Sequence, residues 1–281
     1  NEWLLKKLGE LAACAIDQIK DDSSLSNVFY DFIPLKNEVH EPLMSILSDS
    51  MHESLCSKQI AKTAFQDWET PMECVLPVSA EIPEIILQTD LSILFEKHLS
   101  YIGNDLSERS KKILVSLGAT VLDEALFVEF LSKEDLIIKR TPEWFLRAYV
   151  YLSKVFDVSK TYGNNSFDWE KETLDLFSKL EKTKFILTNH NTLVPLKDTE
   201  NPDRLICYPR PMELSEIKEL LTEGELVFLN RHFQLSTIIK RTDPNPEEEI
   251  RREKTHAFFK GIGVKAEFRQ SHIIDRKSTR L

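Results

Sequence analysis

Apolar residues fall on one helical face at two points of the chain, and each point begins with an acidic residue followed by tryptophan. The first is Glu2-Trp3-Leu4-Leu5, after which Leu8, Leu11, Ala15 and Ile19 continue the apolar face. The second is Glu143-Trp144-Phe145-Leu146, continued by Tyr149, Leu152 and Phe156. The pattern predicts one helix over 2–20 and another that begins at 142.

Further short motifs follow each of these helices in the same order. In the first half they are Leu55 to Phe65, Val75-Leu76-Pro77-Val78 and Leu117-Gly118-Ala119; in the second half they are Leu176 to Phe185, Leu193-Val194-Pro195-Leu196 and Ile262-Gly263-Val264. A period of about 140 residues is that of a small domain, not of a solenoid repeat. We therefore predict two related units, 1–140 and 141–270. The alternative is a chance similarity between two amphipathic helices and two strands that contain proline.

The remaining pattern alternates between short strands and helices. Strands are predicted at 73–78, 205–208 and 226–229, an extended segment at 29–35, and a hairpin over 184–196 with its turn at Asn189-His190-Asn191. Helices are predicted at 83–88, 91–100, 107–117, 123–131, 213–221 and 245–260. The fold class is therefore α+β and helix-rich, with amphipathic helices and a small sheet or hairpin in each unit.

Several of the predicted helices begin or end with residues that are typical of helix caps. Ser107 and Thr141 suit the N-cap, because a hydroxyl can accept an otherwise unpaired amide of the first turn. Gly118 suits the left-handed position after a helix. Glu248 and Arg252 are spaced to pair on one helical face, as are Glu247 and Arg251, so this charged run is interpreted as a helix start.

The hydrophobic content, the glycine count, the net charge and the cysteine spacing limit the kinds of ligand and partner that the chain is expected to bind. With 42% hydrophobic residues the chain can bury a core, and only seven glycines argue against a glycine-rich phosphate loop. A net charge of −10 gives no basic surface for nucleic acid or anionic lipid, so neither nucleic acid nor membrane is predicted as a partner. The four cysteines, Cys14, Cys56, Cys74 and Cys207, have no metal or redox spacing and are predicted to be buried thiols. They favour an intracellular compartment, cytoplasmic or nuclear.

No residue set predicts catalysis. The nucleophile-elbow, P-loop and dinucleotide glycine motifs do not occur, and the seven histidines never lie at the i, i+4 spacing of a helical metal site. His190 lies between two amides, which its place in a hairpin turn explains without a function. The sequence therefore predicts no catalytic, cofactor-binding or metal-binding residue and no cofactor.

With these motifs in place, the chain resembles the region downstream of the ATPase module in sacsin and the plant NO VEIN-type proteins. The resemblance rests on Asn1 to Leu5, Phe32-Ile33-Pro34-Leu35, the Val75-Leu76-Pro77 and Leu193-Val194-Pro195 strands, and the Leu117-Gly118 and Ile262-Gly263-Val264 turns. Members of that family carry an Hsp90-like, histidine-kinase-type ATPase module, whose magnesium-holding Asn, adenine-reading acid and lid glycines are not recognised here. The resemblance implies a non-catalytic companion of a chaperone-like ATPase.

Three hypotheses follow. The first is a structural and interaction segment of a large sacsin-like scaffold, which contacts protein partners or clients and neighbouring repeat units. The second is a stand-alone helical adaptor with an apolar peptide groove, and the third is an enzyme with polar groups converging near His190 or His232. The last seven residues, Asp275 to Leu281, resemble a translated sequencing adapter, and we expect the natural protein to continue past Ile274.

Overall fold

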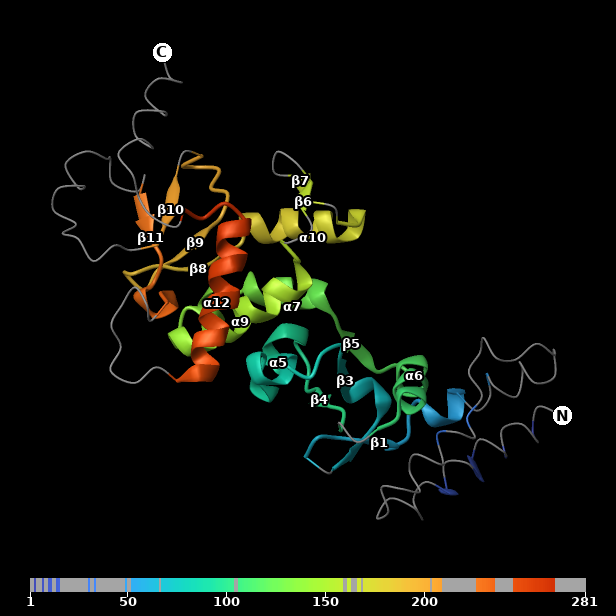
Figure 1. The fold of residues 1–281 in the computed structure, drawn as a ribbon. Helices are drawn as coiled ribbons and strands as arrows, with labels where there is room; N and C mark the ends of the chain where they lie inside the picture. The colour runs from blue at the N-terminus through green and yellow to red at the C-terminus, as the bar shows by residue number, and fades with distance from the viewer. Residues whose placement is uncertain are drawn as a thin grey trace. The chain divides into compact units, whose positions relative to one another are not determined.

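The computed structural model describes most of the chain after residue 51. The described ranges are 52–65, 67–103, 106–158, 161–162, 166–167, 169–202, 204–208, 226–235 and 245–265, with Trp3, Lys7, Glu10, Leu11, Cys14, Ala15, Tyr30, Ile33 and Asp49 before them. The chain divides into two compact units, Asn1–Asp123 (unit 1) and Glu124–Leu281 (unit 2) (Figure 1). Each unit combines helices with small sheets, so the predicted α+β class is confirmed.

Unit 1 is built on a three-stranded parallel sheet. Its described elements are β1 (Ala61–Lys62), β2 (Trp68–Glu69), η2 (Pro71–Glu73), β3 (Cys74–Pro77), α4 (Ile82–Ile85), α5 (Gln88–Phe95), β4 (Ser100–Tyr101), α6 (Glu108–Ser116) and β5 (Thr120–Leu122). The sheet order is β4-β3-β5, and β1 with β2 forms an antiparallel hairpin. Parallel neighbours need crossover connections, which α4 with α5 and then α6 provide.

Unit 2 has the longest of the described helices, and it also contains a hairpin and a pair of parallel strands. It contains α7 (Glu124–Leu131), α8 (Glu134–Ile137), α9 (Pro142–Val155), β6 (Thr161–Tyr162), β7 (Ser166–Phe167), α10 (Lys171–Lys182), β8 (Lys184–Leu187), β9 (Leu193–Pro195), β10 (Leu205–Cys207), β11 (Leu226–Phe228), η3 (Arg231–Phe233) and α12 (Pro246–Gly261). β8 and β9 form a hairpin, and β10 pairs in parallel with β11 on one side and, through Cys207, with Lys265 on the other.

The hairpin meets the parallel strands in the same way in both units. Thr63 at the end of β1 bridges Ile102 after β4, and Thr188 at the end of β8 bridges Leu229 after β11. The backbone hydrogen bonds around these bridges also match; donor first, they are Ala64–Tyr101 and Asn189–Phe228, Gly103–Lys62 and Asn230–Leu187, and Ile102–Val75 and Leu229–Cys207. The central strand of unit 1, β3, therefore corresponds to β10.

The helix before the last strand ends identically in the two units. Gly118 and Gly263 both take the left-handed conformation, with φ of 109° and 101°. The matching amide-to-carbonyl bonds are Leu117–Ile113 and Ile262–Phe258, Gly118–Val115 and Gly263–Lys260, and Ala119–Leu114 and Val264–Phe259. A left-handed residue that closes such 5→2 and 6→1 bonds satisfies the last carbonyls of a helix and redirects the chain into a strand.

A buried tyrosine ties a helix to the start of β1 in unit 1 and to β8 in unit 2. The hydroxyl of Tyr30 donates to the carbonyl of Ile60, three residues before Thr63. The hydroxyl of Tyr149 donates to the carbonyl of Phe185 over 2.9 Å, three residues before Thr188. Both tyrosines lie in helices and are at most 1% exposed.

The two cores differ in side-chain type. Unit 1 packs mainly aliphatic side chains around β1 and β3, among them Ile60, Ile113 and Leu114. In unit 2, Tyr149 is ringed by aromatic side chains whose centroids lie 4.7 to 6.3 Å away; they are Phe145, Phe185, Phe233 and Phe259. Aromatic pairs at such tilted or edge geometries add to the stabilisation from burial.

Many predicted elements are observed. The hairpin 184–196, the strands near 73–78, 205–208 and 226–229 and the final helix are confirmed. Ser107 and Thr141 act as N-caps by accepting the amides of Ser110 and Trp144, and Glu248 pairs with Arg252. The helix expected at 213–221 and the segment 266–281 lie outside the described residues.

Other expectations are wrong. Trp144 is buried at 6% exposure, but Trp3 is 71% exposed, so the two tryptophan motifs that the sequence pattern pairs do not lie in equivalent environments. The strand pair Val75-Leu76-Pro77 and Leu193-Val194-Pro195 is mismatched, because β3 is a central parallel strand whereas β9 belongs to a hairpin. Tyr30 is helical, not extended, and Cys14 is exposed.

Within the part of the chain that the structure describes, no helix is long and apolar enough to span a bilayer.

Candidate functional site

The hairpin tip of unit 1 lies between β1 and β2, and its residues Ala64, Phe65 and Asp67 are exposed. The amide of Thr63 donates to the carbonyl of Asp67 over 2.8 Å, which closes the loop. The amide of Phe65 donates to the hydroxyl of Thr63 over 3.2 Å. This geometry turns the Phe65 side chain outward, where 62% of the residue is exposed.

An apolar groove of about 400 Å³ lies beside this hairpin tip. Ala64 and Phe65 form one wall, Pro83 and Leu87 from the α4–α5 region form another, and Tyr101 and Ile102 complete it. The volume is within the range of sites that hold a small molecule or a large side chain. We call this site the unit 1 groove.

The polar side-chain atoms of Gln88 and Tyr101 in the groove are hydrogen-bonded within the fold. The side-chain amide of Gln88 donates to the carbonyl of Leu99, and its oxygen accepts the amide of Tyr101 over 3.2 Å. The hydroxyl of Tyr101 donates to the carbonyl of Ile86 over 2.8 Å. Burial, and secondarily the charge of Asp90, raise the pKa of Tyr101, so its phenol is neutral. The groove therefore offers apolar surface, with no acid–base pair for catalysis among these residues.

The hairpin tip of unit 2, residues 188–192, is closed by its own polar side chains. The side-chain oxygen of Asn189 accepts the amide of Arg231 over 3.0 Å, and the side-chain amide of Asn230 donates to Asn191 over 3.2 Å. His190 is exposed, and its backbone amide donates to the hydroxyl of Thr188 over 3.2 Å. The position that Phe65 takes in unit 1 is thus a solvated histidine in unit 2.

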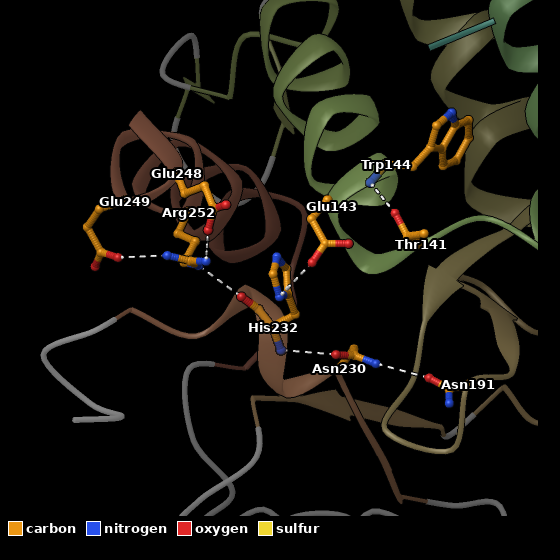
Figure 2. A network of polar contacts seen from close by, with 9 residues as sticks. All are labelled: Thr141, Glu143, Trp144, Asn191, Asn230, His232, Glu248, Glu249 and Arg252. Atoms are coloured by element: carbon orange, nitrogen blue, oxygen red, sulfur yellow. Dashed lines mark hydrogen bonds and ion pairs between the residues drawn. The ribbon is translucent and has the colours of Figure 1, made fainter. Parts of the chain in front are cut away.

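A buried arginine is connected to this closed tip by hydrogen bonds through His232 and Asn230 (Figure 2). Arg252 on α12 is 1% exposed and pairs with Glu248 at 2.5 Å and Glu249 at 3.2 Å. Its Nε donates to the backbone carbonyl of His232 over 3.0 Å. A buried guanidinium needs its charge balanced and its donors paired, and two carboxylates with one carbonyl give each of its three nitrogens an acceptor.

The network continues through His232 to the start of α9. The Nδ1 of His232 lies 3.7 Å from a carboxylate oxygen of Glu143, as Figure 2 shows, and the amide of His232 donates to Asn230 over 3.0 Å. Thr141 caps the same helix end, at the amide of Trp144. A hydrogen bond from its own backbone amide, followed by the hydroxyl of Thr141 and the charges of His232 and Arg147, lowers the pKa of Glu143. We interpret this network as a brace that joins α12, η3 and α9.

The sequence anticipated only part of these sites. It indicated the Glu248–Arg252 pair and the polar turn at Asn189-His190-Asn191, but not the contact of His232 with Glu143 or the unit 1 groove. The sequence predicted no strand at β1 or β2, so it offered no signal for a hairpin tip that exposes Phe65 or for the groove beside it. Among the described residues, no group of three or more His, Cys, Asp or Glu side chains is placed to hold a metal ion.

Comparison of the chain with protein-family models, with curated proteins and with solved structures finds no match.

Proposed function

We propose that this chain is a structural and interaction segment made of two copies of one α+β module, within a large protein of the sacsin or NO VEIN type. The observation that carries the proposal is the matched set of hydrogen bonds in units 1 and 2. Unrelated sheets can share a topology, but shared bridges, a shared tyrosine contact and a shared left-handed glycine are many independent coincidences. Two copies of a domain of this size present two separate surfaces to partners, which suits a scaffold.

The module as proposed runs from a first helix to the strand after the glycine. The division of the chain between Asp123 and Glu124 fits this definition, because unit 1 ends just after β5 and α7 then opens unit 2. The relevant equivalences are Tyr30 with Tyr149, Thr63 with Thr188, Val75 with Cys207 and Gly118 with Gly263. An experimental structure tests this definition: β1, β3 and β4 should superpose on β8, β10 and β11, and a misfit of these strands would remove the module.

The segment is proposed to work by binding protein partners or clients in the cytoplasm or nucleus, with no catalysis of its own. Calorimetric titration of the 281-residue chain with MgATP tests this part. We expect no saturable heat, since an ATPase module would lie elsewhere in the protein. Clear binding at millimolar or tighter affinity would overturn the non-catalytic assignment.

A stand-alone adaptor that binds peptides is the second candidate, and the unit 1 groove is the observation that favours it. The full-length transcript discriminates between the two. An Hsp90-like module encoded upstream of Asn1 supports the scaffold, whereas an unrelated upstream sequence supports the adaptor.

A further inference from the structure

We propose that the unit 1 groove docks a protein segment that inserts one bulky apolar side chain and carries Lys or Arg on either side of it. The proposal rests on the proposed function, since it names where that interaction segment binds and what kind of partner it takes. Three features of unit 1 carry it: the shape of the groove, the exposure of its walls and the charge around it.

The walls of the groove expose more apolar surface than the fold requires. Phe65 is 62% and Leu87 43% exposed, and both face a site of about 400 Å³. Contiguous exposed apolar surface that is rimmed by polar residues is typical of a binding site. An aromatic or large aliphatic side chain would fit this volume and remove both walls from water.

The matched region of unit 2 shows that the module can do without such a surface. There Asn189 and His190 stand where unit 1 has Ala64 and Phe65, and Asn189 bonds to the amide of Arg231. Two backbone hydrogen bonds of the tips match: Thr63 to Asp67 corresponds to Thr188 to Thr192, and Ala64 to Tyr101 corresponds to Asn189 to Phe228. The exposed phenylalanine is therefore a property of unit 1 alone and has no role in closing its loop.

The charge around the groove selects a basic partner. Residues 61–103 contain seven acidic residues against two lysines. Asp67 lies on the hairpin tip and Glu84 lies beside the groove wall at Pro83, and both are exposed. One of the two lysines, Lys97, donates to the carbonyl of Met72 over 3.3 Å. A segment with Lys or Arg next to its apolar anchor gains both attraction and a faster encounter at this surface.

Methyl NMR of the whole 281-residue chain can test this docking. The probe is the capped peptide Lys-Lys-Ala-Trp-Ala-Lys-Lys, compared with one peptide in which Ser replaces Trp and another in which Glu replaces every Lys. With alanine and isoleucine methyls labelled, the signals of Ala64 and Ile102 should shift saturably with the basic tryptophan peptide only. The methyls of Ala148 and Ile206 in unit 2 should stay unchanged.

Two matched variants locate the binding. Phe65→Ser removes a groove wall and should weaken the peptide by at least about tenfold, the loss expected for an aromatic anchor in an interface. Ile93→Ser, which removes an apolar side chain that is 52% exposed on α5 outside the groove, should leave the affinity unchanged.

The outcomes separate this proposal from the one on which it rests. If Ala64 and Ile102 do not shift up to the solubility limit of the peptide, or if Phe65→Ser binds as tightly as the parent, the docking site is refuted. Equal binding of the glutamate peptide refutes the basic partner. None of these results tests the two-module proposal. The superposition of the strands in an experimental structure tests that proposal.

Discussion

Units 1 and 2 have matching strand bridges and matching left-handed glycines, but the lengths of their helices and the side chains of their hairpin tips differ. Helices α6 and α12 both end two residues before their left-handed glycine, yet α6 has nine residues and α12 has 16. The extra turns lie at the start of α12. They contain Glu248 and Glu249, and Arg252 follows Glu249 by three residues. The position that matches Arg252 in unit 1 is Ser107, the N-cap of α6. The longer helix of unit 2 thus carries Arg252 and the two glutamates of the polar brace.

The difference teaches where this fold tolerates change. The strand bridges, the tyrosine contact and the glycine turn are the same in both units, because each satisfies backbone groups that burial would otherwise leave unpaired. The hairpin tips and the helix start lie at the surface and vary, with an open apolar tip in unit 1 and a closed polar tip in unit 2. Such positions are free to carry recognition.

Two cysteines allow each unit to be followed separately. Cys74 on β3 and Cys207 on β10 are both fully buried, on the central strand of their own unit. Burial, with smaller contributions from Glu69 and Glu73, raises the pKa of Cys74 to about 12, so its thiol reacts only when the unit opens. In a background with Cys14→Ser and Cys56→Ser, the labelling rate of each thiol reports the opening of its unit.

The largest effect is expected from Arg252→Ala. The variant removes the cation that Glu248 and Glu249 neutralise and the donor to the His232 carbonyl, so unit 2 should lose about 3 kcal/mol, the low end for breaking a buried ion pair whose acids stay in reach of water. Cys207 should label much faster and Cys74 at the parent rate. Arg251→Ala is the matched control: its 3.8 Å pair with Glu247 is exposed, and its loss should change little. Equal effects of the two variants would contradict the brace.

A smaller loss is expected when the shared tyrosine contact is cut. The hydroxyl of Tyr149 donates to the carbonyl of Phe185 and accepts the amide of Leu187, each over 2.9 Å. Tyr149→Phe leaves these buried groups without a partner and should cost unit 2 about 2 kcal/mol. Tyr30→Phe should accelerate the labelling of Cys74 instead. If each variant accelerates both thiols alike, the two units open together and cannot be compared as separate modules.

The sequence predicted local features well because they depend on a few neighbouring residues. The caps at Ser107 and Thr141, the turn at Gly118 and the hairpin at 184–196 each follow from side-chain chemistry within one turn. The pairing of the two units failed where it relied on apolar residues alone, since Val75-Leu76-Pro77 fits a hairpin strand and a central parallel strand equally well. Only hydrogen-bond partners distant in sequence separate these cases.

The sites were harder to predict for the same reason. The unit 1 groove joins the hairpin tip to the α4–α5 region and to the strand end at Tyr101, and the brace joins α9, η3 and α12. Each depends on long-range packing, which no local spacing reveals. The pair of Glu248 with Arg252 was predicted because it lies within one helix.

The glycine turns offer a third, smaller test of the shared plan. An alanine side chain at φ near 100° is strained, so Gly263→Ala should cost unit 2 about 1–2 kcal/mol although nothing lies within 4 Å of the added carbon. Gly118→Ala should cost unit 1 slightly more, because its added carbon would lie 3.0 Å from a side-chain carbon of Met72. Adding Met72→Ala to Gly118→Ala should remove only that excess. Thiol labelling measures both losses, and a neutral Gly263→Ala would mean that the turn is not set by backbone strain.

The smallest effect concerns the charge of Glu143 at the start of α9, which is stabilised first by its own backbone amide, then by the hydroxyl of Thr141 and by the charge of His232. The pKa of Glu143 is lowered in the folded state, so its charge stabilises unit 2 above the ordinary pKa of a glutamate, and this contribution is lost as the pH falls through the lowered value. Glu143→Gln should therefore lower the urea midpoint of unit 2 at pH 6, and its difference from the parent should shrink as the pH is lowered to 3. Cys207 labelling in urea with a disulfide reagent active in acid gives the midpoint.

Glu253→Gln, which neutralises an exposed acid on α12, is the control for net charge in that experiment. It should leave the difference between pH 6 and pH 3 at the parent value, because Glu253 lies outside the brace. If Glu143→Gln and Glu253→Gln follow the same pH curve, the contact of α9 with η3 rests on packing around Phe233 and not on charge. The polar brace of unit 2 would then end at Arg252, and the two units would differ only in the length of the helix before the glycine and in their hairpin tips.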